Sequence, residues 1–360
     1  MLLKKLIKNC PKKLLSIEVK GLSSDTRTLK KGDLFFTLKG SENNGEKFVT
    51  QALKKGACAI VSSKELKGIS KIIKVNNVRD YLGKICSKFY NKKPKNIIAV
   101  TGTNGKSSVA DLFHQIFTLN GIPVATIGTL GIKSKKIKKN SLTSPDVITL
   151  HKELSQLKEK RIENVLLEAS SHGLLQGRLD GINVKVGIFT NFSQDHMDYH
   201  KSMKEYFNAK MILFKKILKK NSYIITDRTI PEFKIIKKIA QNKKLKKIVI
   251  DLTEKEYDLT NFKPIGDFQK KNLIMAIKTC EVLGLNKKKI QKCINKLKSV
   301  KGRLELAREF SDQTKVYIDF AHTPDAINTA ITSLKNYYKK DVTIIFGCGG
   351  ERDKNKRKKM

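Results

Sequence analysis

The sequence predicts an α/β protein with a central domain, built on a parallel β-sheet and a phosphate-binding loop, between two smaller α/β domains. The chain has 360 residues, which is long for one hydrophobic core. From residue 96 onward, short apolar runs alternate with amphipathic helical stretches, as in parallel strands with crossover helices. One of these runs enters a glycine-containing turn and then a helix. We expect domains at 1–92, 93–301 and 302–360.

The composition indicates a folded protein without a specific nucleic-acid partner. The formal net charge is +41, but the lysines are spread over nearly every segment, without interleaved aromatic residues. We interpret them as a solvated surface that still attracts anionic substrates. The six cysteines form no Cys-x-x-Cys pair, and no eighteen apolar residues run together. We therefore expect a cytoplasmic protein with reduced thiols and no membrane segment.

The first domain is expected to be a small α/β unit. Residues 32–38 read as a turn that enters a strand, and residues 48–56 read as a helix. The polar run 91–95 contains a proline and is a plausible linker to the second domain.

The second domain supplies the pattern of a parallel sheet. Its strand candidates are 97–100, 164–167, 186–189 and 223–226. Residues 233–247 are expected to form a surface helix and loop. Further helices are expected at 109–119 and 271–283, followed by a lysine-rich helix that ends near residue 301.

The third domain begins after Arg303 with a β-α-β pattern. The expected strands are 316–320 and 342–346, and the expected helix is 324–337. A βαβ unit of about sixty residues cannot bury both faces of its sheet. We therefore expect this Rossmann-like domain to be incomplete in this chain.

A phosphate-binding loop follows the first strand of the second domain. The loop and helix start read Thr101-Gly102-Thr103-Asn104-Gly105-Lys106-Ser107-Ser108. Glycines let backbone N–H groups face an anion, and the helix N-terminus adds positive potential. Lys106 is expected at the β- and γ-phosphates of ATP, and the Ser107 hydroxyl is expected on Mg²⁺. The general motif asks for glycine where Val100 stands, and the loop alone does not choose between kinase, ATPase and ligase.

Polar residues follow three further segments of this domain. Glu168 ends one strand, His196 follows another, and Lys210 lies on the next helical stretch. Taken singly, they read as a salt-bridge partner, a hydrogen-bonded histidine and a surface lysine. Together behind a phosphate loop, they predict a catalytic site.

These motifs resemble the Mur ligases, the ATP-dependent, ADP-forming amide ligases of peptidoglycan synthesis. The segments that carry the resemblance are Thr-Gly-Thr-Asn-Gly-Lys-Ser, Glu-Ala-Ser-Ser-His-Gly-Leu, Asp-His-Met-Asp-Tyr-His and Ala-Lys. They are similar to the branch that adds meso-diaminopimelate or L-lysine to UDP-N-acetylmuramoyl-L-alanyl-D-glutamate. The resemblance covers essentially the whole chain, and Ser-Ser-His-Gly-Leu and Asp-Tyr-His are its most specific parts.

The resemblance implies the metal site and its modification. Two Mg²⁺ ions would be held by Ser107, Glu168, His196 and Lys210, the last converted by CO₂ into a carbamate (N6-carboxylysine). A carbamate replaces a cation with a carboxylate-like anion, which suits a divalent ion. Lys106, Glu168, His196 and Lys210 would then be the catalytic residues.

The resemblance also implies the substrate contacts. ATP would meet residues 102–108 together with Asn272, Arg303 and His322, while Gln269 departs from the asparagine that the family uses. The muramoyl dipeptide would meet Thr143, Ser144, Ser170, Gln176 and Arg178. The uridine diphosphate would meet Ser24, Thr26, Ser41, Glu42 and Asn43, and the incoming amino acid would meet Arg352. The family's Asp-Asn-Pro-Arg segment would lie beyond Met360.

The function expected from the resemblance is formation of the amide bond to meso-diaminopimelate through an acyl phosphate, by a monomeric enzyme. Three alternatives stay open at this point. The same ligase could add L-lysine, the chain could be a folylpolyglutamate synthetase-like ligase, or it could be a basic, non-catalytic protein that binds nucleotides or nucleic acid. The segments around Ser24 and His172 favour the Mur ligase over the folate enzyme.

Overall fold

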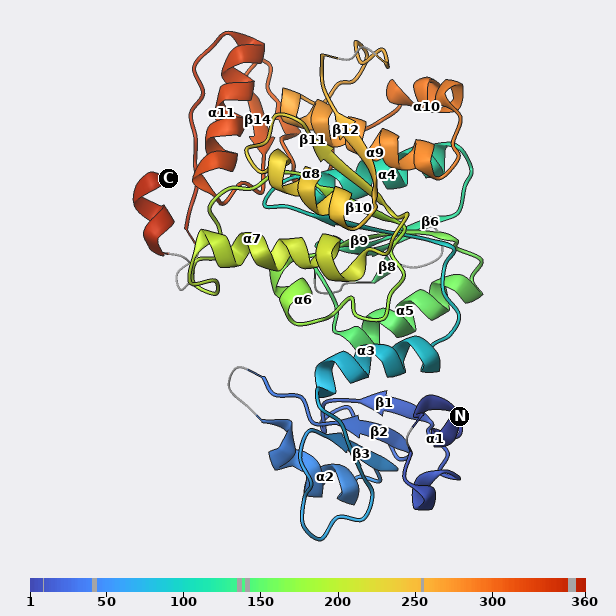
Figure 1. The fold of residues 1–360 in the computed structure, drawn as a ribbon. Helices are drawn as coiled ribbons and strands as arrows, with labels where there is room; N and C mark the ends of the chain where they lie inside the picture. Colours follow the sequence, from blue (N-terminus) through green and yellow to red (C-terminus); the bar gives the residue numbers. More distant parts are fainter. Residues whose placement is uncertain (9, 41–43, 135–137, 140–142, 254–255, 349–353) are drawn as a thin grey trace. The chain divides into compact units, whose positions relative to one another are not determined.

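The computed structural model describes residues 1–360 except residue 9 and segments 41–43, 135–137, 140–142, 254–255 and 349–353 (Figure 1). The chain divides into two compact units, which are treated separately below. The first comprises Met1–Lys93, Pro145–Glu159 and Gln176–Ile182, and the second comprises Pro94–Ser144, Lys160–Leu175 and Asn183–Met360. Two segments that follow the phosphate loop in sequence therefore pack with the N-terminal residues.

The first unit contains a four-stranded parallel sheet. Its strands run in the order β1 (Gly21–Ser23), β2 (Asp33–Phe36), β3 (Ala59–Ser62) and β4 (Ile72–Lys74). Its helices are α1 (Leu3–Leu6), α2 (Val49–Lys54), α3 (Val78–Phe89) and α5 (Val147–Glu159), with 3₁₀ turns at Lys12–Leu14 and Gly45–Phe48. The helix predicted at 48–56 is thus a 3₁₀ turn continued by α2.

Both faces of this sheet are buried. On β2, Leu34 and Phe36 belong to one apolar cluster, with Leu82 and Ile85 of α3, whereas Phe35 belongs to a second cluster on the opposite face. Alternate residues of a strand point to opposite faces, so a continuous apolar run is what a doubly covered parallel sheet requires.

The second unit contains an eight-stranded sheet, in the order β12-β11-β10-β5-β9-β6-β7-β8. Strands β12 to β6 in that order pair in parallel, and β7 and β8 add an antiparallel edge. The strands are β5 (Asn96–Thr101), β6 (Val124–Gly128), β7 (Gly131–Lys133), β8 (Lys138–Lys139), β9 (Asn164–Glu168), β10 (Val186–Phe189), β11 (Tyr223–Asp227) and β12 (Lys246–Ile250). The four predicted strands are confirmed. Strand β12 was missed, because this edge strand begins with two exposed lysines that hide its apolar pattern.

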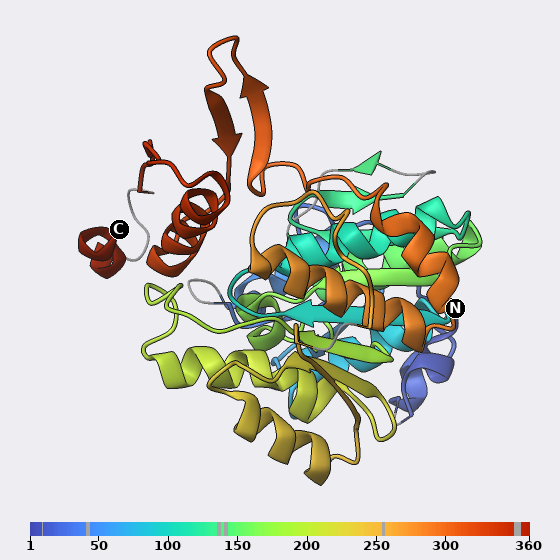
Figure 2. The same cartoon turned by 90° about the horizontal axis from the view of Figure 1, so that it is seen from above.

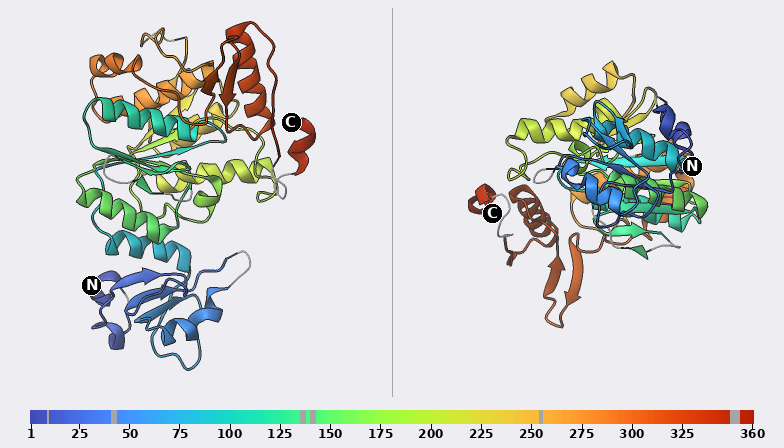
Figure 3. Two further views of the ribbon diagram at one scale, coloured as in Figure 1. Left: turned by 180° about the vertical axis from the view of Figure 1, so that it is seen from behind. Right: turned by 90° about the horizontal axis from the view of Figure 1, so that it is seen from below.

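Helices cover both faces of this sheet. Helices α4 (Lys106–Leu119) and α9 (Asp267–Val282) pack together on one face, and α7 (Met203–Ile212) and α8 (Phe233–Asn242) lie on the other (Figures 1 and 3). The remaining helices are α6 (Ser171–Leu175), a π-helical turn at Leu213–Ile217, and α10 (Lys287–Ile294). Helix α4 begins three residues before its predicted start, because Gly105 takes a left-handed conformation (φ 85°) at the N-cap. No helix in the described part of the chain has the length and apolar character needed to cross a membrane.

The C-terminal part of this unit differs from the predicted β-α-β pattern. Strands β13 (Glu305–Glu309) and β14 (Lys315–Ile318) form an antiparallel pair, followed by α11 (Pro324–Tyr338) and a 3₁₀ turn at Lys354–Lys359 (Figure 2). The strand predicted at 342–346 was wrong: these residues form no strand, and Ile345 is 97% exposed. An extended segment becomes a strand only where a neighbouring backbone pairs with it, and the described residues provide no such neighbour for 342–346.

Candidate active site

The phosphate loop spans residues 102–105 between β5 and α4, and its shape depends on two glycines. Gly102 (φ 146°) lies so close to Thr190 that a Cβ would stand 1.9 Å from the threonine Oγ1. At Gly105, a Cβ would stand 2.6 Å from Asn272 Oδ1. Both positions have a positive φ and a close neighbour, so only glycine fits them without displacement. The two glycines therefore let the loop pack closely against Thr190 and Asn272.

Lys106 is the first residue of α4 and folds back over the loop. Its Nζ donates to the carbonyl oxygens of Gly102 (2.9 Å) and Thr103 (2.7 Å). Burial, with the nearby Arg303 charge, lowers the pKa of Lys106, and Glu168 opposes the shift. The ammonium group is thus held at the mouth of the anion-binding loop, where the helix N-terminus adds positive potential.

A hydroxyl–carboxylate pair lies beside the loop. The Ser107 Oγ donates to Glu168 Oε2 (3.0 Å), and Glu168 also accepts from the backbone N–H and the hydroxyl of Thr129, each at 3.1 Å. Glu168 ends β9 and is only 3% exposed. Arg303 joins the group by donating from Nη2 to Ser107 Oγ (3.2 Å). The structure thus brings Ser107, Glu168 and Arg303 together, and it adds Thr129, which the sequence analysis missed.

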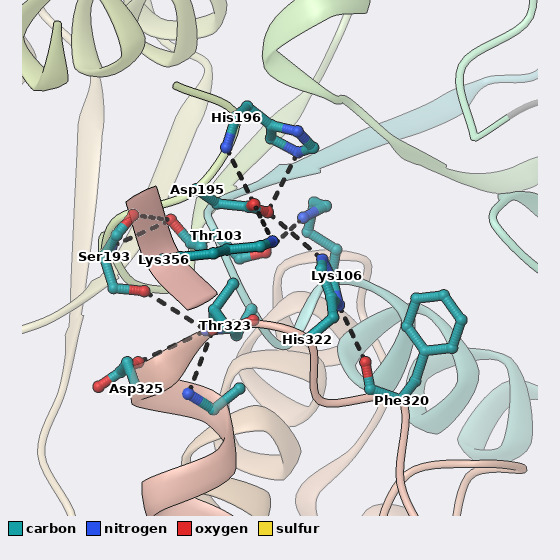
Figure 4. Close-up of polar contacts among 12 residues, drawn as sticks. Thr103, Lys106, Ser193, Asp195, His196, Phe320, His322, Thr323, Asp325 and Lys356 are labelled. Carbon is teal, nitrogen blue, oxygen red and sulfur yellow. Dashed lines mark hydrogen bonds and ion pairs between the residues drawn. The ribbon is translucent and has the colours of Figure 1, made fainter. Parts of the chain in front are cut away.

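Asp195 is a second residue that the sequence analysis did not select, and it is the hub of the contacts in Figure 4. Its carboxylate lies 3.3 Å from His196 Nε2, 3.4 Å from His322 Nε2 and 3.2 Å from Lys356 Nζ. Burial alone would raise the pKa of Asp195, but the hydrogen bond from His322 and the neighbouring cationic groups hold it below its usual range. Asp195 opens the Asp-His-Met-Asp-Tyr-His segment that carries the resemblance, and this place in the sequence was the signal that could have found it.

His196 is held as a neutral imidazole. Burial, aided by His172, Lys210 and Lys106, lowers the pKa of His196 to about 4, against the opposing Asp195 charge. Its ring packs edge-on against His172, with centroids 4.9 Å apart. His322 was predicted to contact ATP. It faces Asp195 and also hydrogen-bonds the Phe320 carbonyl (2.9 Å) through Nδ1.

Lys210 is buried beneath the phosphate loop. It is 1% exposed, and its Nζ donates to the Gly102 carbonyl (2.7 Å) while lying 4.3 Å from the centroid of the Tyr206 ring. Burial, together with the Lys106 charge, lowers the pKa of Lys210 well below its usual range. This lysine on α7 is not a surface residue, and its amine is biased toward the unprotonated form.

Hydroxyl groups gather next to Glu168. The Ser144 Oγ donates to the Glu168 carbonyl (2.8 Å) and lies 3.1 Å from Ser170 Oγ, while Thr143 Oγ1 lies 3.2 Å from Thr129 Oγ1. The structure therefore brings together three of the residues predicted to contact the dipeptide.

Four more of the predicted substrate residues lie in the described part of the first compact unit. Arg178 donates from Nε (3.1 Å) and Nη2 (2.7 Å) to Gln176 Oε1, so these two predicted residues are paired. Thr26 donates to Gln51 Oε1 (2.8 Å), and Ser24, two residues earlier, is half-buried. Residues 41–43 and Arg352 lie outside the described residues.

A cavity of about 220 Å³ adjoins the loop. It is lined by Asn104 of the loop, Ser108 of α4, Asn272 of α9, and by Arg303 and Phe320. Gln269 does not line it: this side chain is 1% exposed and donates to the Arg303 carbonyl (3.2 Å), which suggests a structural role. Lys271, on the cavity wall, pairs with Asp227 (2.6 Å). Of the predicted nucleotide residues outside the loop and α4, Asn272 and Arg303 line this cavity and His322 does not.

No cluster of three or more His, Cys, Asp or Glu side chains that could hold a metal ion occurs among the described residues. The Ser107–Glu168 pair nevertheless offers the oxygen ligands that Mg²⁺ prefers. In proteins, Mg²⁺ commonly completes its coordination shell with water and phosphate oxygens.

Comparison with known proteins identifies relatives of this chain. Residues 18–90, 100–291 and 302–360 match the family models described as Mur ligase family, catalytic domain; Mur ligase middle domain; and Mur ligase, glutamate ligase domain. A UDP-N-acetylmuramoyl-L-alanyl-D-glutamate–2,6-diaminopimelate ligase of Rickettsia bellii is 38% identical over 95% of this chain and 76% of the relative. The ligase of the same name from Brucella melitensis is 35% identical over 95% and 75%.

Solved structures show the same fold. A structure described as that same diaminopimelate ligase matches 100% of this chain and 79% of its own, with a TM-score of 0.78 and 28% identity. A bifunctional folylpolyglutamate synthase/dihydrofolate synthase with Mn, AMPPNP and L-glutamate bound covers 72% of this chain and 70% of its own, with a TM-score of 0.55 and 16% identity. The latter likeness supports the fold alone.

Proposed function

Because this chain belongs to the Mur ligase family, we propose that it is the ATP-dependent ligase that joins UDP-N-acetylmuramoyl-L-alanyl-D-glutamate to meso-2,6-diaminopimelate in peptidoglycan synthesis. Relatives at 35% and 38% identity over 95% of the chain have this name. The observation that supports a catalytic chain is the buried Ser107–Glu168 pair beside an intact phosphate loop. A remnant that had lost its chemistry would have no need to keep a carboxylate buried at this place.

ATP would bind at the phosphate loop, with its triphosphate at the N-terminus of α4. The phosphate oxygens would accept hydrogen bonds from backbone N–H groups of residues 102–108 and from the Lys106 ammonium. In the structure, this ammonium donates to two backbone carbonyls. Asn272 and Arg303 lie on the adjoining cavity, where the nucleoside would fit. We also propose that His322 contacts ATP, as the resemblance implies; its ring faces Asp195 and does not line the cavity.

Mg²⁺ would be held by Ser107, Glu168 and His196. The hydroxyl and carboxylate oxygens are 3.0 Å apart, and the imidazole is neutral, so each can donate a lone pair. Bound magnesium would offset the negative charge that gathers at the γ-phosphate. We propose two magnesium ions, as the resemblance implies, and Lys210 would be a ligand of the second.

Lys210 would be carbamylated by CO₂. Only an unprotonated amine attacks CO₂, and burial beside Lys106 favours that form. The amine nitrogen bonds to the carbon of CO₂ and releases one proton, which leaves a carbamate anion. This anion would remove the repulsion between Lys210 and Lys106.

For the acid substrate, we propose the contacts that the resemblance implies. The proposed contacts are Thr143, Ser144, Ser170, Gln176, Arg178, Ser24 and Thr26, with Ser41, Glu42 and Asn43 outside the described residues. Arg352, also outside them, would meet the incoming amino acid.

The reaction would proceed in two steps. A D-glutamate carboxylate oxygen attacks the γ-phosphorus of ATP, and ADP leaves with the bond electrons, giving an acyl phosphate. The amine then attacks the acyl carbon, the carbon–oxygen bond to phosphate breaks, and the nitrogen releases one proton as phosphate leaves and the amide forms. Lys106 would offset charge in the first step, and the α4 N-terminus would fix the phosphates in line with the attacking oxygen. We also propose that the enzyme is a cytoplasmic monomer.

One assay tests the function. Purified chain is supplied with ATP, magnesium and UDP-muramoyl dipeptide, and ADP release is measured with meso-diaminopimelate or L-lysine as the amine. We expect release that requires both the dipeptide and diaminopimelate, and that Lys106→Ala removes. Faster ADP release with L-lysine than with meso-diaminopimelate would show that lysine is the amine substrate instead. Release that ignores the dipeptide, combined with salt-sensitive retention on DNA, would favour the nucleic-acid alternative.

A further inference from the structure

Arg79 lies in the first compact unit and was not singled out by the sequence. It is the second residue of α3, whose start is fixed because Asn77 Oδ1 accepts from the backbone N–H groups of Arg79 (3.0 Å) and Asp80 (3.1 Å). Its guanidinium donates from Nη1 to the Gln176 carbonyl (2.8 Å) and from Nη2 to the Lys39 carbonyl (2.9 Å). One half-buried side chain therefore ties together two segments that are remote in sequence.

The segment that begins at Gln176 is fixed to α3 at several points. Gly181 lies so close to α3 that a Cβ would stand 2.2 Å from the Gly83 carbonyl oxygen, and a Cβ on Gly177 would stand 3.5 Å from Arg79 Cδ. The buried His151 ring donates from Nε2 to the Asp180 carbonyl (2.9 Å). Arg79 is thus the anchor at the Gln176 end of a segment that is already held at its other end.

This anchor acts on Arg178 through one intermediate residue. The Gln176 backbone is held by Arg79, and the Gln176 side-chain oxygen in turn accepts two bonds from the Arg178 guanidinium. A shift of the Gln176 backbone would therefore move the group that orients Arg178. The Arg178 guanidinium is suited to bind an anion, since its planar fork matches carboxylate and phosphate groups.

On the other side, Arg79 holds Lys39, which pairs with Asn44 in an isolated antiparallel bridge. The next residue, Gly45, donates to the Leu38 carbonyl (2.9 Å). Two carbonyls on separate segments need two donors with fixed divergence. Arg79 uses two separate nitrogens, Nη1 and Nη2, whereas a lysine would have to bring both carbonyls to one nitrogen.

We propose that Arg79 is a positioning residue for the UDP-muramoyl dipeptide, acting by fixing Gln176 and hence the Arg178 guanidinium that receives the anionic substrate. This inference rests on the proposed function and adds a residue to the same site. Arg79 need not touch the substrate: its effect is exerted through the two carbonyls that it holds.

The test measures dissociation constants by titration calorimetry, for UDP-muramoyl dipeptide and separately for the ATP analogue AMPPNP. The variants are Arg79→Gln, Arg79→Lys, Arg178→Gln and the double variant Arg79→Gln/Arg178→Gln. The matched control is Lys84→Gln, which removes an exposed charge from the same helix. Because a lost charged hydrogen-bond donor weakens the anchor, we expect Arg79→Gln to bind the dipeptide about tenfold more weakly. AMPPNP binding should stay within about twofold, since its residues lie in the other unit.

Three results decide the inference. The double variant should bind the dipeptide no more weakly than Arg178→Gln alone, because Arg79 acts through Arg178; additive losses would overturn the proposal. Wild-type affinity in Arg79→Lys would show that charge suffices and would overturn the role of the fork. If the unaltered chain binds AMPPNP but no dipeptide, the proposed function itself fails, which separates that outcome from a failure confined to Arg79.

Discussion

The carboxylate of Glu168 can be displaced by a single methyl group on the neighbouring strand. Gly128 ends β6, and its backbone conformation is one that any residue can adopt, because it is not among the residues with positive φ. A Cβ at this position would stand 2.1 Å from Glu168 Oε1 and 2.5 Å from its Cδ, whereas ordinary contact begins at 3.4 Å. Gly128→Ala therefore perturbs the site without straining its own backbone.

The size of the effect follows from these distances. The carboxylate must retreat by about 1 Å, which breaks its bonds with Ser107 Oγ and with the N–H and hydroxyl of Thr129. A displacement of about 1 Å in a catalytic constellation costs about 10²-fold in rate. Loss of charged hydrogen bonds costs about 1.5–3 kcal/mol each, so we expect a stability loss of about 2–4 kcal/mol after relaxation.

The assay compares ADP release and urea unfolding for Gly128→Ala and a control, Gly121→Ala. A Cβ at Gly121 meets nothing within 4 Å, but its φ of 70° imposes strain. The control should thus lose about 1–2 kcal/mol of stability with turnover retained. If Gly128→Ala turned over substrate as fast as the control, Glu168 would not be needed where the structure places it, and the reasoning about the Ser107–Glu168 pair would be refuted.

Three further outcomes are expected. Lys210→Met should abolish ADP release. Because burial lowers the folded-state pKa of Lys210, the contribution of this lysine to the free energy of unfolding should rise with pH up to about 10.4. In CO₂-free urea titrations, the free energy of unfolding of the unaltered chain should therefore increase relative to that of the variant between about pH 7 and 9.5, and a constant difference would contradict this. His151, with its pKa lowered to about 4 by burial, stays neutral in the folded state, so its stabilisation is present above pH 6.5 and is lost as pH falls toward 4; His151→Gln should flatten this loss, by up to about 3 kcal/mol, in acid unfolding followed by circular dichroism. Asn272→Ala should raise the dissociation constant of AMPPNP about tenfold without changing that of the dipeptide, and equal losses for both ligands would indicate a general folding defect instead.

Much of the fold could be read from local patterns. The apolar runs that became β5, β9, β10 and β11 are buried on both faces, and such runs are continuous in sequence. The start of α4 was predicted three residues late, because the polar residues Lys106, Ser107 and Ser108 precede its apolar pattern. Edge strand β12 and hairpin strand β13 were missed because β12 begins with two exposed lysines and four of the five residues of β13 are exposed, so only pairing with a neighbour makes them strands.

The sequence by itself determined the loop, the helix that follows it and the residue types that a phosphoryl-transfer site requires, because glycine conformations, a lysine and a serine at fixed spacing are local properties of the chain. Only the tertiary structure decided that Lys210 is buried beneath that loop, that Asp195 is shared by His196 and His322, and that Arg79 holds Gln176. These are contacts between residues separated by many positions, and their strength depends on burial and on the distance between atoms. Neither quantity is encoded at any single position, since each arises only when the strands and helices have packed.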